Sequence, residues 1–196
     1  MQYVYTMNGV SKIIPPKREI IKDISLSFFP GAKIGVLGLN GSGKSTLLKL
    51  CTRLLEVNEG AVELDGVPID SYALAQLRSQ IAQVLQDPFL FGEPLSANIS
   101  YDDPERALDL IWDAADAAAL RETVLTFPEQ MSTLVGERGV TLSGGQKQRT
   151  TLARGLIRNA PVLILDDCFS AVDTETEEHI LSRLKRLRAG KTTILV

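Results

Sequence analysis

The chain has 196 residues, which suits one domain, and 21 basic against 24 acidic residues give a net charge of −3. With 44% apolar and 23% charged residues the composition is globular, and the balance of charge gives no argument for a nucleic-acid or anionic-membrane surface. Two cysteines are too few for a secreted disulfide framework and fit a reducing cytosol. No apolar run approaches the ~20 residues of a membrane span. We therefore expect a soluble intracellular domain.

The apolar pattern along the chain predicts strands and helices in alternation. Strands are expected at 3–6, 24–29, 33–37, 61–64, 67–69, 81–85, 162–165 and 192–196. Helices are expected at 46–55, 108–119, 152–157 and 174–188. Asp65-Gly66 between two strands predicts a hairpin. This order indicates an α/β core that carries an inserted helical lobe at about 96–158.

Residues 38–45 match the phosphate-binding pattern G-x-x-x-x-G-K-[ST] at every fixed position, between a predicted buried strand and a predicted helix. The glycines let successive backbone N–H groups point into one concavity, and the helix N-terminus adds about half a positive charge to it. Lys44 is expected to reach the β- and γ-phosphates, Ser45 to ligate Mg²⁺ and Thr46 to bond the α-phosphate. The expected nucleotide-binding residues here are Gly38, Asn40, Gly41, Ser42, Gly43, Lys44, Ser45 and Thr46.

Two carboxylates follow the apolar strand 162–165 directly. Because ligands lie beyond the carboxyl ends of strands in a parallel sheet, we expect Asp166 near the phosphate loop, where it would hold Mg²⁺ through water. Asp167 is expected to face the γ-phosphate and to orient or deprotonate the attacking water. The alternative for both residues is a solvated turn after a strand.

A second glycine turn, Ser143-Gly144-Gly145-Gln146, precedes a predicted helix and again exposes backbone N–H groups to an anion. One γ-phosphate does not need two such nests in one chain. Two chains facing head to tail would use both, so we expect each chain to close the nucleotide site of the other. The alternative is a flexible loop before a helix.

Together these motifs resemble the ATP-binding domain of the ABC (ATP-binding cassette) family. The phosphate loop looks like Walker A, 162–167 looks like Walker B, and 142–146 is similar to the LSGGQ signature. Gln86 resembles the Q-loop glutamine, which implies contact with Mg²⁺, water and the transporter. Residues 170–173 resemble the D-loop at the dimer interface.

The resemblance covers nearly all of 1–196 and implies a P-loop NTPase core with a mostly parallel sheet, an N-terminal antiparallel β region and an α-helical lobe. It implies the ligands ATP and Mg²⁺, a second ATP-binding domain as partner, and ATP-driven dimer closure followed by hydrolysis. The implied catalytic residues are Asp167, Gln86 and Lys44, and the implied metal-site residues are Ser45, Gln86 and Asp166.

Two branches of the family are suggested by different parts of the chain. Residues of about 51–196 resemble multidrug and lipid exporters; there Glu137 implies contact with a transmembrane domain, and the domain would lie peripherally at the cytoplasmic face of a membrane. Residues of about 3–50 resemble the ABC-F translation factors, which act on ribosomes, and a natural or engineered join near 49–52 would explain the difference. The alternatives to an exporter domain are therefore an ABC-F fragment and a nucleotide-binding fragment without turnover.

Two departures from the family pattern bear on activity. The family usually has Glu directly after the Walker B Asp, whereas Asp167 is shorter by roughly 1.5 Å. A misplacement of about that size costs on the order of 100-fold in rate, and the resemblance implies the degenerate half of a heterodimer. The family's switch histidine should follow the strand 193–196, and His179 on the preceding helix is no substitute. We therefore expect a domain incomplete at its C-terminus, in which nucleotide binding outlasts hydrolysis.

Aromatic and sulfur side chains receive less specific predictions. Exporters place an adenine-stacking tyrosine near the end of the first strand, a position without an aromatic here. Tyr3 and Tyr5 are candidates for that role, although strand packing is the favoured interpretation. Trp112 and Phe127 are expected in the core of the helical lobe, and Cys168 is expected to pack rather than to take part in redox chemistry.

Overall fold

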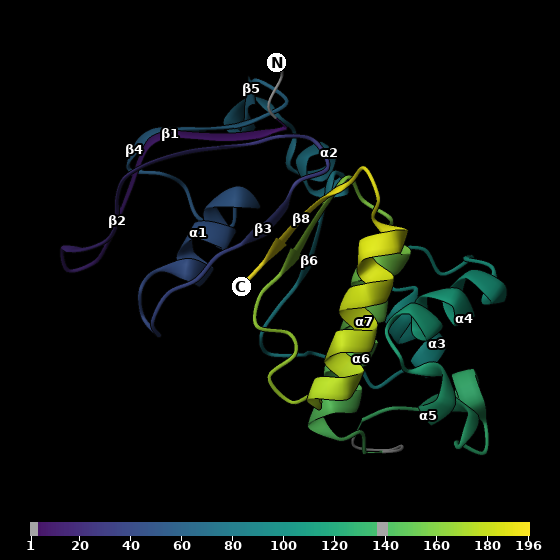
Figure 1. The fold of residues 1–196 in the computed structure, drawn as a ribbon. Helices are drawn as coiled ribbons and strands as arrows, with labels where there is room; N and C mark the ends of the chain where they lie inside the picture. Colours follow the sequence, from purple (N-terminus) through teal and green to yellow (C-terminus); the bar gives the residue numbers. More distant parts are fainter. Residues whose placement is uncertain (1–3, 137–140) are drawn as a thin grey trace. The chain divides into compact units, whose positions relative to one another are not determined.

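The computed structural model describes residues 4–136 and 141–196 (Figure 1). It divides into two units, one containing the described residues up to 81 together with 190–196, the other containing 82–189. Among the described helices, none has both the length and the hydropathy that crossing a membrane would require.

An antiparallel sheet forms most of the first unit, with the strand order β2-β1-β4-β5. Its strands are β1 (Tyr5–Ile14), β2 (Arg18–Phe28), β4 (Glu59–Leu64) and β5 (Val67–Pro68). The predicted hairpin is confirmed, since Asp65 and Gly66 both have a left-handed backbone (φ 52° and 75°) between β4 and β5. The predicted first two strands were too short, because register shifts in β1 break the alternation of its side chains.

The first unit also contains a parallel pair, β3 (Lys33–Gly35) with β8 (Thr192–Leu195), and the helix α1 (Lys44–Cys51). A short helical turn and the helix α2 (Leu74–Ser79) follow β5. The fully buried side chains of this unit include Tyr5, Met7, Leu48 and Leu50. The sequence predicted parallel strands in the core and an antiparallel N-terminal region. The parallel pair of β3 and β8 and the antiparallel sheet agree with that prediction.

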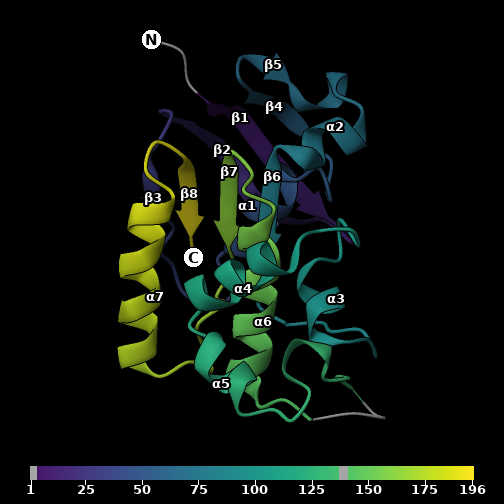
Figure 2. The same cartoon turned by 90° about the vertical axis from the view of Figure 1, so that its right-hand side faces the viewer.

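Helices dominate the second unit, in which α6 (Gly144–Ile157) contacts both α3 (Leu95–Ile99) and α4 (Leu108–Ala117). Figure 2 shows α7 to the left of α6 and α3 to its right. The strand β7 (Val162–Leu165) is buried along its whole length and is hydrogen-bonded to β6 (Ile81–Val84). The remaining helices are α5 (Arg121–Leu125), a 3-10 turn (Gln130–Ser132) and α7 (Thr174–Leu187).

The end of α7 buries a charged residue in place of its last leucine. Leu184 is buried, whereas Leu187 is 60% exposed. Arg188 is buried instead, and its guanidinium donates to the carbonyl oxygens of Ala160 (3.0 Å) and Pro161 (3.1 Å). Burial lowers the pKa of Arg188 to about 10. The charged side chain of Arg188 therefore links the end of α7 to residues 160 and 161 by donating hydrogen bonds to their carbonyl oxygens.

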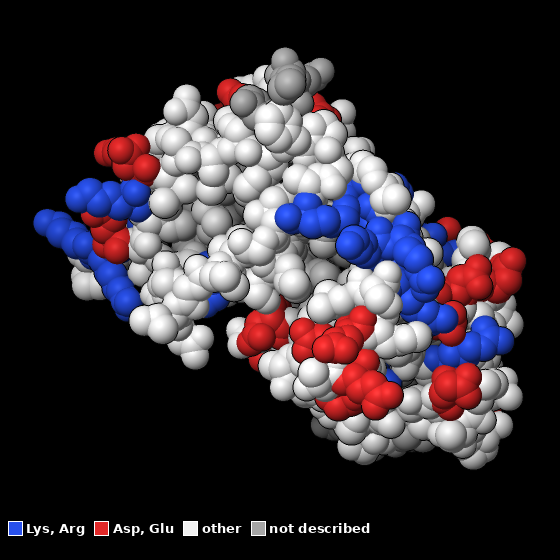
Figure 3. All heavy atoms as spheres, viewed as in Figure 1, with Lys and Arg blue, Asp and Glu red and all other residues white. Residues whose placement is uncertain are grey.

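Charged residues on α7 are distributed in the way that the helix dipole favours. The Asp173 carboxylate caps the helix by accepting from the Thr176 N–H at 2.9 Å. Figure 3 shows acidic side chains over the start of α7 and basic ones over its end, an order that stabilises a helix electrostatically. The first-turn acids are Glu175 and Glu177, and the last-turn bases are Lys185 and Arg186.

Both cysteines are buried and free, and this burial raises the pKa of each thiol to about 12. Because the thiolate is the nucleophile, we expect neither Cys51 nor Cys168 of the native protein to react with iodoacetamide at about pH 8, and both to react after unfolding. Mass spectrometry of the labelled peptides measures this. Rapid labelling of Cys168 in the native protein would contradict its assignment as a packing residue.

Candidate nucleotide-binding site

The phosphate loop joins β3 to α1 in the first unit. Gly41 and Gly43 have left-handed backbones (φ 81° and 93°), a conformation that favours glycine. A Cβ at Gly38 would lie 2.6 Å from Ser42 Oγ, so the Ser42 side chain would have to shift to admit a larger residue there. Residues 38–42 are exposed, which leaves the loop open to a ligand.

Lys44 folds back over this loop. Its Nζ donates to the carbonyl oxygens of Gly38 (2.6 Å) and Leu39 (3.2 Å). No acidic residue lies in the first turn of α1, so no side chain there offsets the positive end of the helix dipole. Ser45 and Thr46 are half-buried in the same turn. The loop therefore presents an ammonium group and a helix N-terminus together, as phosphate binding requires.

The paired carboxylates lie in the second unit at the end of β7. Asp166 is 5% exposed, and its N–H donates to the carbonyl oxygen of Val84 at 2.9 Å. Asp167 is exposed and has a left-handed backbone (φ 46°), which aspartate tolerates better than most residues. Gln86 Nε2 donates to Asp167 Oδ2 at 3.0 Å. The structure thus brings together Gln86 and Asp167, a contact that the sequence motifs did not predict.

The second glycine turn begins α6 through a capping box. Ser143 Oγ accepts from the Gln146 N–H (3.3 Å), and Gln146 Oε1 accepts from the Ser143 N–H (2.9 Å). Gly144 and Gly145 occupy the first helical positions, and the first turn carries no acidic residue. The predicted helix start is therefore confirmed, and no acidic side chain in that turn opposes an anion there.

The donor set assigned to Mg²⁺ consists of hard oxygen atoms, from Ser45, Gln86 and Asp166. Among the described residues, no group of three or more His, Cys, Asp or Glu side chains could hold a metal ion. Magnesium commonly keeps several waters and binds through one or two protein groups and the substrate phosphates. Ser45 lies in the first unit and Gln86 and Asp166 lie in the second, and each residue by itself offers a donor that suits an ion bound together with a nucleotide. Their joint site stays a prediction.

Several predicted residues have other outcomes. Tyr3 and Glu137 lie outside the described residues. Tyr5 is 1% exposed and its ring stacks on Phe28 with centroids 6.4 Å apart, so the strand-packing interpretation is confirmed. Trp112 is only half-buried and lies against the Arg121 guanidinium, 5.1 Å from its ring centroid, rather than deep in the core. His179 lies on the predicted helix, α7, and is exposed.

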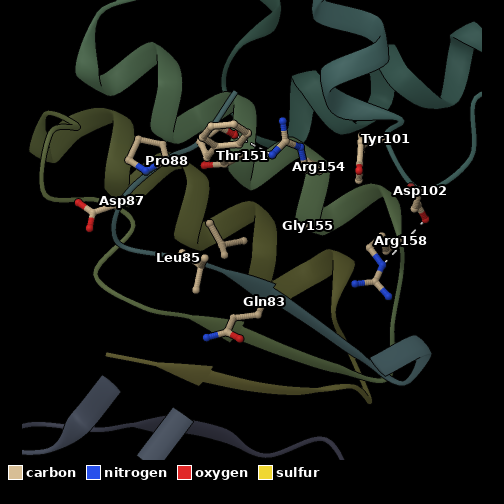
Figure 4. A pocket seen from close by; sticks show the side chains of 12 residues that line it. Gln83, Leu85, Asp87, Pro88, Tyr101, Asp102, Thr151, Arg154, Gly155 and Arg158 are labelled. Atoms are coloured by element: carbon tan, nitrogen blue, oxygen red, sulfur yellow. Dashed lines mark hydrogen bonds and ion pairs between the residues drawn. The ribbon is translucent and has the colours of Figure 1, made fainter. Parts of the chain in front are cut away.

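Sequence reasoning missed a cavity of about 340 Å³ in the second unit (Figure 4). One wall comes from α6, including Arg154, and another from the segment that follows β6. Phe89 and Tyr101 line it and are 65% and 60% exposed. Arg154 donates to the carbonyl oxygens of Phe89 and Asn98 and so ties the walls together. A sequence signal for this cavity is Phe89, an aromatic residue in the segment that follows β6.

The glycine loop between a strand and a helix, the buried strand that ends in two carboxylates and the mixed α/β core define a P-loop nucleotide-binding fold. The family model for ABC transporters matches residues 21–170. The chain belongs to the ABC transporter family.

Several similar proteins within this family have names that refer to export or to a flippase. The chain is 43% identical to a multidrug export ATP-binding/permease protein, YgaD of Bacillus subtilis (strain 168), over 92% of this chain and 31% of that protein. It is also 43% identical to an ATP-dependent lipid A-core flippase of Burkholderia pseudomallei (strain 1710b), over 91% of this chain and 30% of the flippase. Among solved structures, a bacterial Atm1-family ABC exporter with ATP bound is similar over 100% of this chain and 34% of that chain, with 34% identity and a TM-score of 0.94.

The chain spans about a third of the length of these relatives. The alignment with YgaD leaves only a small fraction of this chain unmatched, so it includes most of the segment 3–50. The likeness to exporters therefore extends into the segment whose sequence resembled the ABC-F factors.

Proposed function

We propose that this chain is the ATP-binding and ATP-hydrolysing domain of an exporter-type ABC transporter. The observation that carries the proposal is the open phosphate loop, in which glycines with left-handed backbones, the Lys44 ammonium and the start of α1 all converge. The names of the relatives, which are export ATP-binding/permease proteins and flippases, support the assignment to transport.

Each motif receives its own role in hydrolysis. The loop amides and Lys44 bind the β- and γ-phosphates, which frees Lys44 from the two carbonyls it now contacts. Asp167 orients the attacking water and accepts its proton, and Gln86 holds the Asp167 carboxylate by the observed hydrogen bond. Ser45, Asp166 and Gln86 would hold Mg²⁺, and the chemistry that the ion would supply is neutralisation of charge that develops on the phosphates. The bond between the γ-phosphorus and the bridging oxygen breaks, giving ADP and phosphate.

A second ATP-binding domain completes the proposed mechanism. The capped start of α6 offers the N–H groups of Gly144 and Gly145 to an anion, with Ser143 and Gln146 fixed beside them. The phosphate loop already supplies one complete nest within the same chain. We therefore assign the α6 nest to the nucleotide held by a partner domain, identical or different.

Purified chain, ATP and Mg²⁺ test this proposal directly. We expect saturable binding of radiolabelled ATP, and a doubling of molar mass by analytical ultracentrifugation when ATP is present and Mg²⁺ is chelated. Phosphate release is expected to be slow because of Asp167. A chain that binds no ATP would refute the assignment, whereas binding without phosphate release under any condition would favour the fragment without turnover.

The transmembrane part of such a transporter is proposed to dock at the cavity beside α6. Two exposed aromatic rings, those of Phe89 and Tyr101, line it, and apolar surface of this kind marks binding sites for other proteins. The permease portion named in the relatives lies in the two-thirds of their length that this chain does not cover. The occupant we assign is therefore a segment of a membrane-embedded polypeptide, whether fused to this chain or separate.

Photo-crosslinking checks this docking surface. With p-benzoylphenylalanine in place of Tyr101, in cells that express the natural reading frame, we expect cross-links to a membrane-embedded segment. The same probe at Leu74, an exposed position of α2, serves as the control and should give none. Cross-links to ribosomal proteins in place of membrane segments would support the ABC-F alternative and refute the exporter assignment.

A further inference from the structure

A buried glutamine, Gln148, joins α6 to the segment that follows the carboxylates. Gln148 is 4% exposed and uses both ends of its carboxamide. Its Nε2 donates to Ser170 Oγ at 2.8 Å, and its Oε1 accepts from the Ala171 N–H at 2.9 Å. A buried amide that is hydrogen-bonded at both its nitrogen and its oxygen fixes the groups it contacts, because breaking either bond leaves a buried polar atom unpaired.

Ser170 extends this connection to the Asp167 backbone. Its hydroxyl accepts from Gln148 and donates to the carbonyl oxygen of Asp167 at 3.3 Å. The Val172 N–H donates to the Phe169 carbonyl at 2.9 Å, which closes the turn. A continuous series of hydrogen bonds therefore leads from the first turns of α6 to the residue assigned to water activation.

The glycines at the start of α6 pack against the same turn. A Cβ at Gly145 would lie 2.6 Å from the Ala171 carbonyl oxygen, and a Cβ at Gly144 would lie 3.3 Å from Ala171 Cβ. Contacts below 3.0 Å to backbone require the backbone to move. Gly145 is thus needed for the close approach of Ala171, independently of any role in phosphate binding.

We infer that Gln148 is a positioning residue that fixes the turn 167–172 against the start of α6 and thereby holds Asp167 in place for hydrolysis. The inference rests on the role proposed above for Asp167. It follows that one rigid group of contacts fixes the positions of both a phosphate bound at the start of α6 and the Asp167 carboxylate. If the nucleotide held by a partner domain displaces α6, Ser170 would transmit that displacement to Asp167.

Gln148→Leu keeps the size of the side chain and removes both hydrogen bonds. We expect amide hydrogen exchange at Ala171 and Val172 to accelerate ~10-fold or more, since the turn loses its fixed anchor. We expect kcat to fall by ~10-fold or more while the dissociation constant for ATP stays within about twofold, because the phosphate loop is untouched. Gln76→Leu, the same change at an exposed position of α2, is the matched control and should alter none of these.

Ser170→Ala separates the contact between Gln148 and the turn from the contact between the turn and Asp167. It also replaces Gln148→Leu as the test if that variant does not fold. It leaves the Gln148–Ala171 bond intact and removes the link to Asp167, so protection of Ala171 should persist while kcat falls; Ser170→Thr, which keeps the hydroxyl, should restore kcat. Unchanged exchange at Val172 with unchanged kcat in folded Gln148→Leu would overturn the inference. If the parent chain binds ATP and releases no phosphate, the proposed hydrolysis fails, and the exchange rate of Val172 alone decides whether Gln148 positions the turn.

Discussion

Replacement of Lys44 by alanine is expected to weaken ATP binding by about 10- to 100-fold. A charge-assisted hydrogen bond contributes about 1.5–3 kcal/mol, and each 1.4 kcal/mol corresponds to roughly tenfold in affinity. The Lys44 ammonium lies over the phosphate loop, 2.6 Å from the Gly38 carbonyl oxygen, on the element expected to hold the phosphates. Equilibrium binding of a fluorescent ATP analogue in the presence of Mg²⁺ measures the effect.

Lys49→Ala is the matched control for this experiment, because Lys49 is an exposed lysine in the last turn of the same helix. Its removal changes the net charge equally but lies away from the loop, and we expect an affinity within about twofold of the parent chain, as for an exposed charge far from the ligand. Equal affinities of the two variants would show that Lys44 does not contact the phosphates.

Asp167 gives the second large expected effect. The Asp167→Glu variant should release phosphate faster, by as much as ~100-fold, because the added methylene extends the carboxylate by roughly 1.5 Å toward the position usual in the family. Asp167→Asn should abolish turnover while ATP still binds, because the amide cannot accept a proton and yet suits the same left-handed backbone. Single-turnover phosphate release, with the chain supplied with a partner domain, measures both variants.

The Asn variant also serves as the structural control, since it preserves size, backbone preference and an oxygen that can accept from Gln86. If Asp167→Glu turns over ATP at the parent rate, the shorter side chain does not limit hydrolysis. In that event the left-handed backbone at 167, which a glutamate tolerates less well, is the next cause to test.

Local chemistry explains which features the sequence could predict. The phosphate loop, the Asp65-Gly66 hairpin and the start of α6 are encoded by neighbouring residues whose backbone preferences act over a few positions, and the structure shows the hairpin and the helix start as expected. The full length of β1 was hidden because bulges interrupt the alternation of its side chains.

Contacts between distant segments could not be predicted in the same way. Arg188 reads as the exposed end of an amphipathic helix, but its burial depends on backbone acceptors near residue 160. Gln148 lies in a polar stretch of α6, and nothing in its neighbours indicates that its amide bonds to residues 170 and 171. The same holds for Gln86, whose contact with Asp167 joins positions 81 residues apart.

The Ser143 hydroxyl can serve two partners at once. In the capping box its oxygen accepts from the Gln146 N–H, and an alcohol retains a proton to give away while doing so. A phosphoryl oxygen arriving from a neighbouring molecule could therefore receive that proton without unwinding the first turn of α6. Binding of a phosphate there requires no further ordering of the helix. Threonine at 143 should preserve both the capping hydrogen bond and the bond to the phosphate, whereas alanine would lose both.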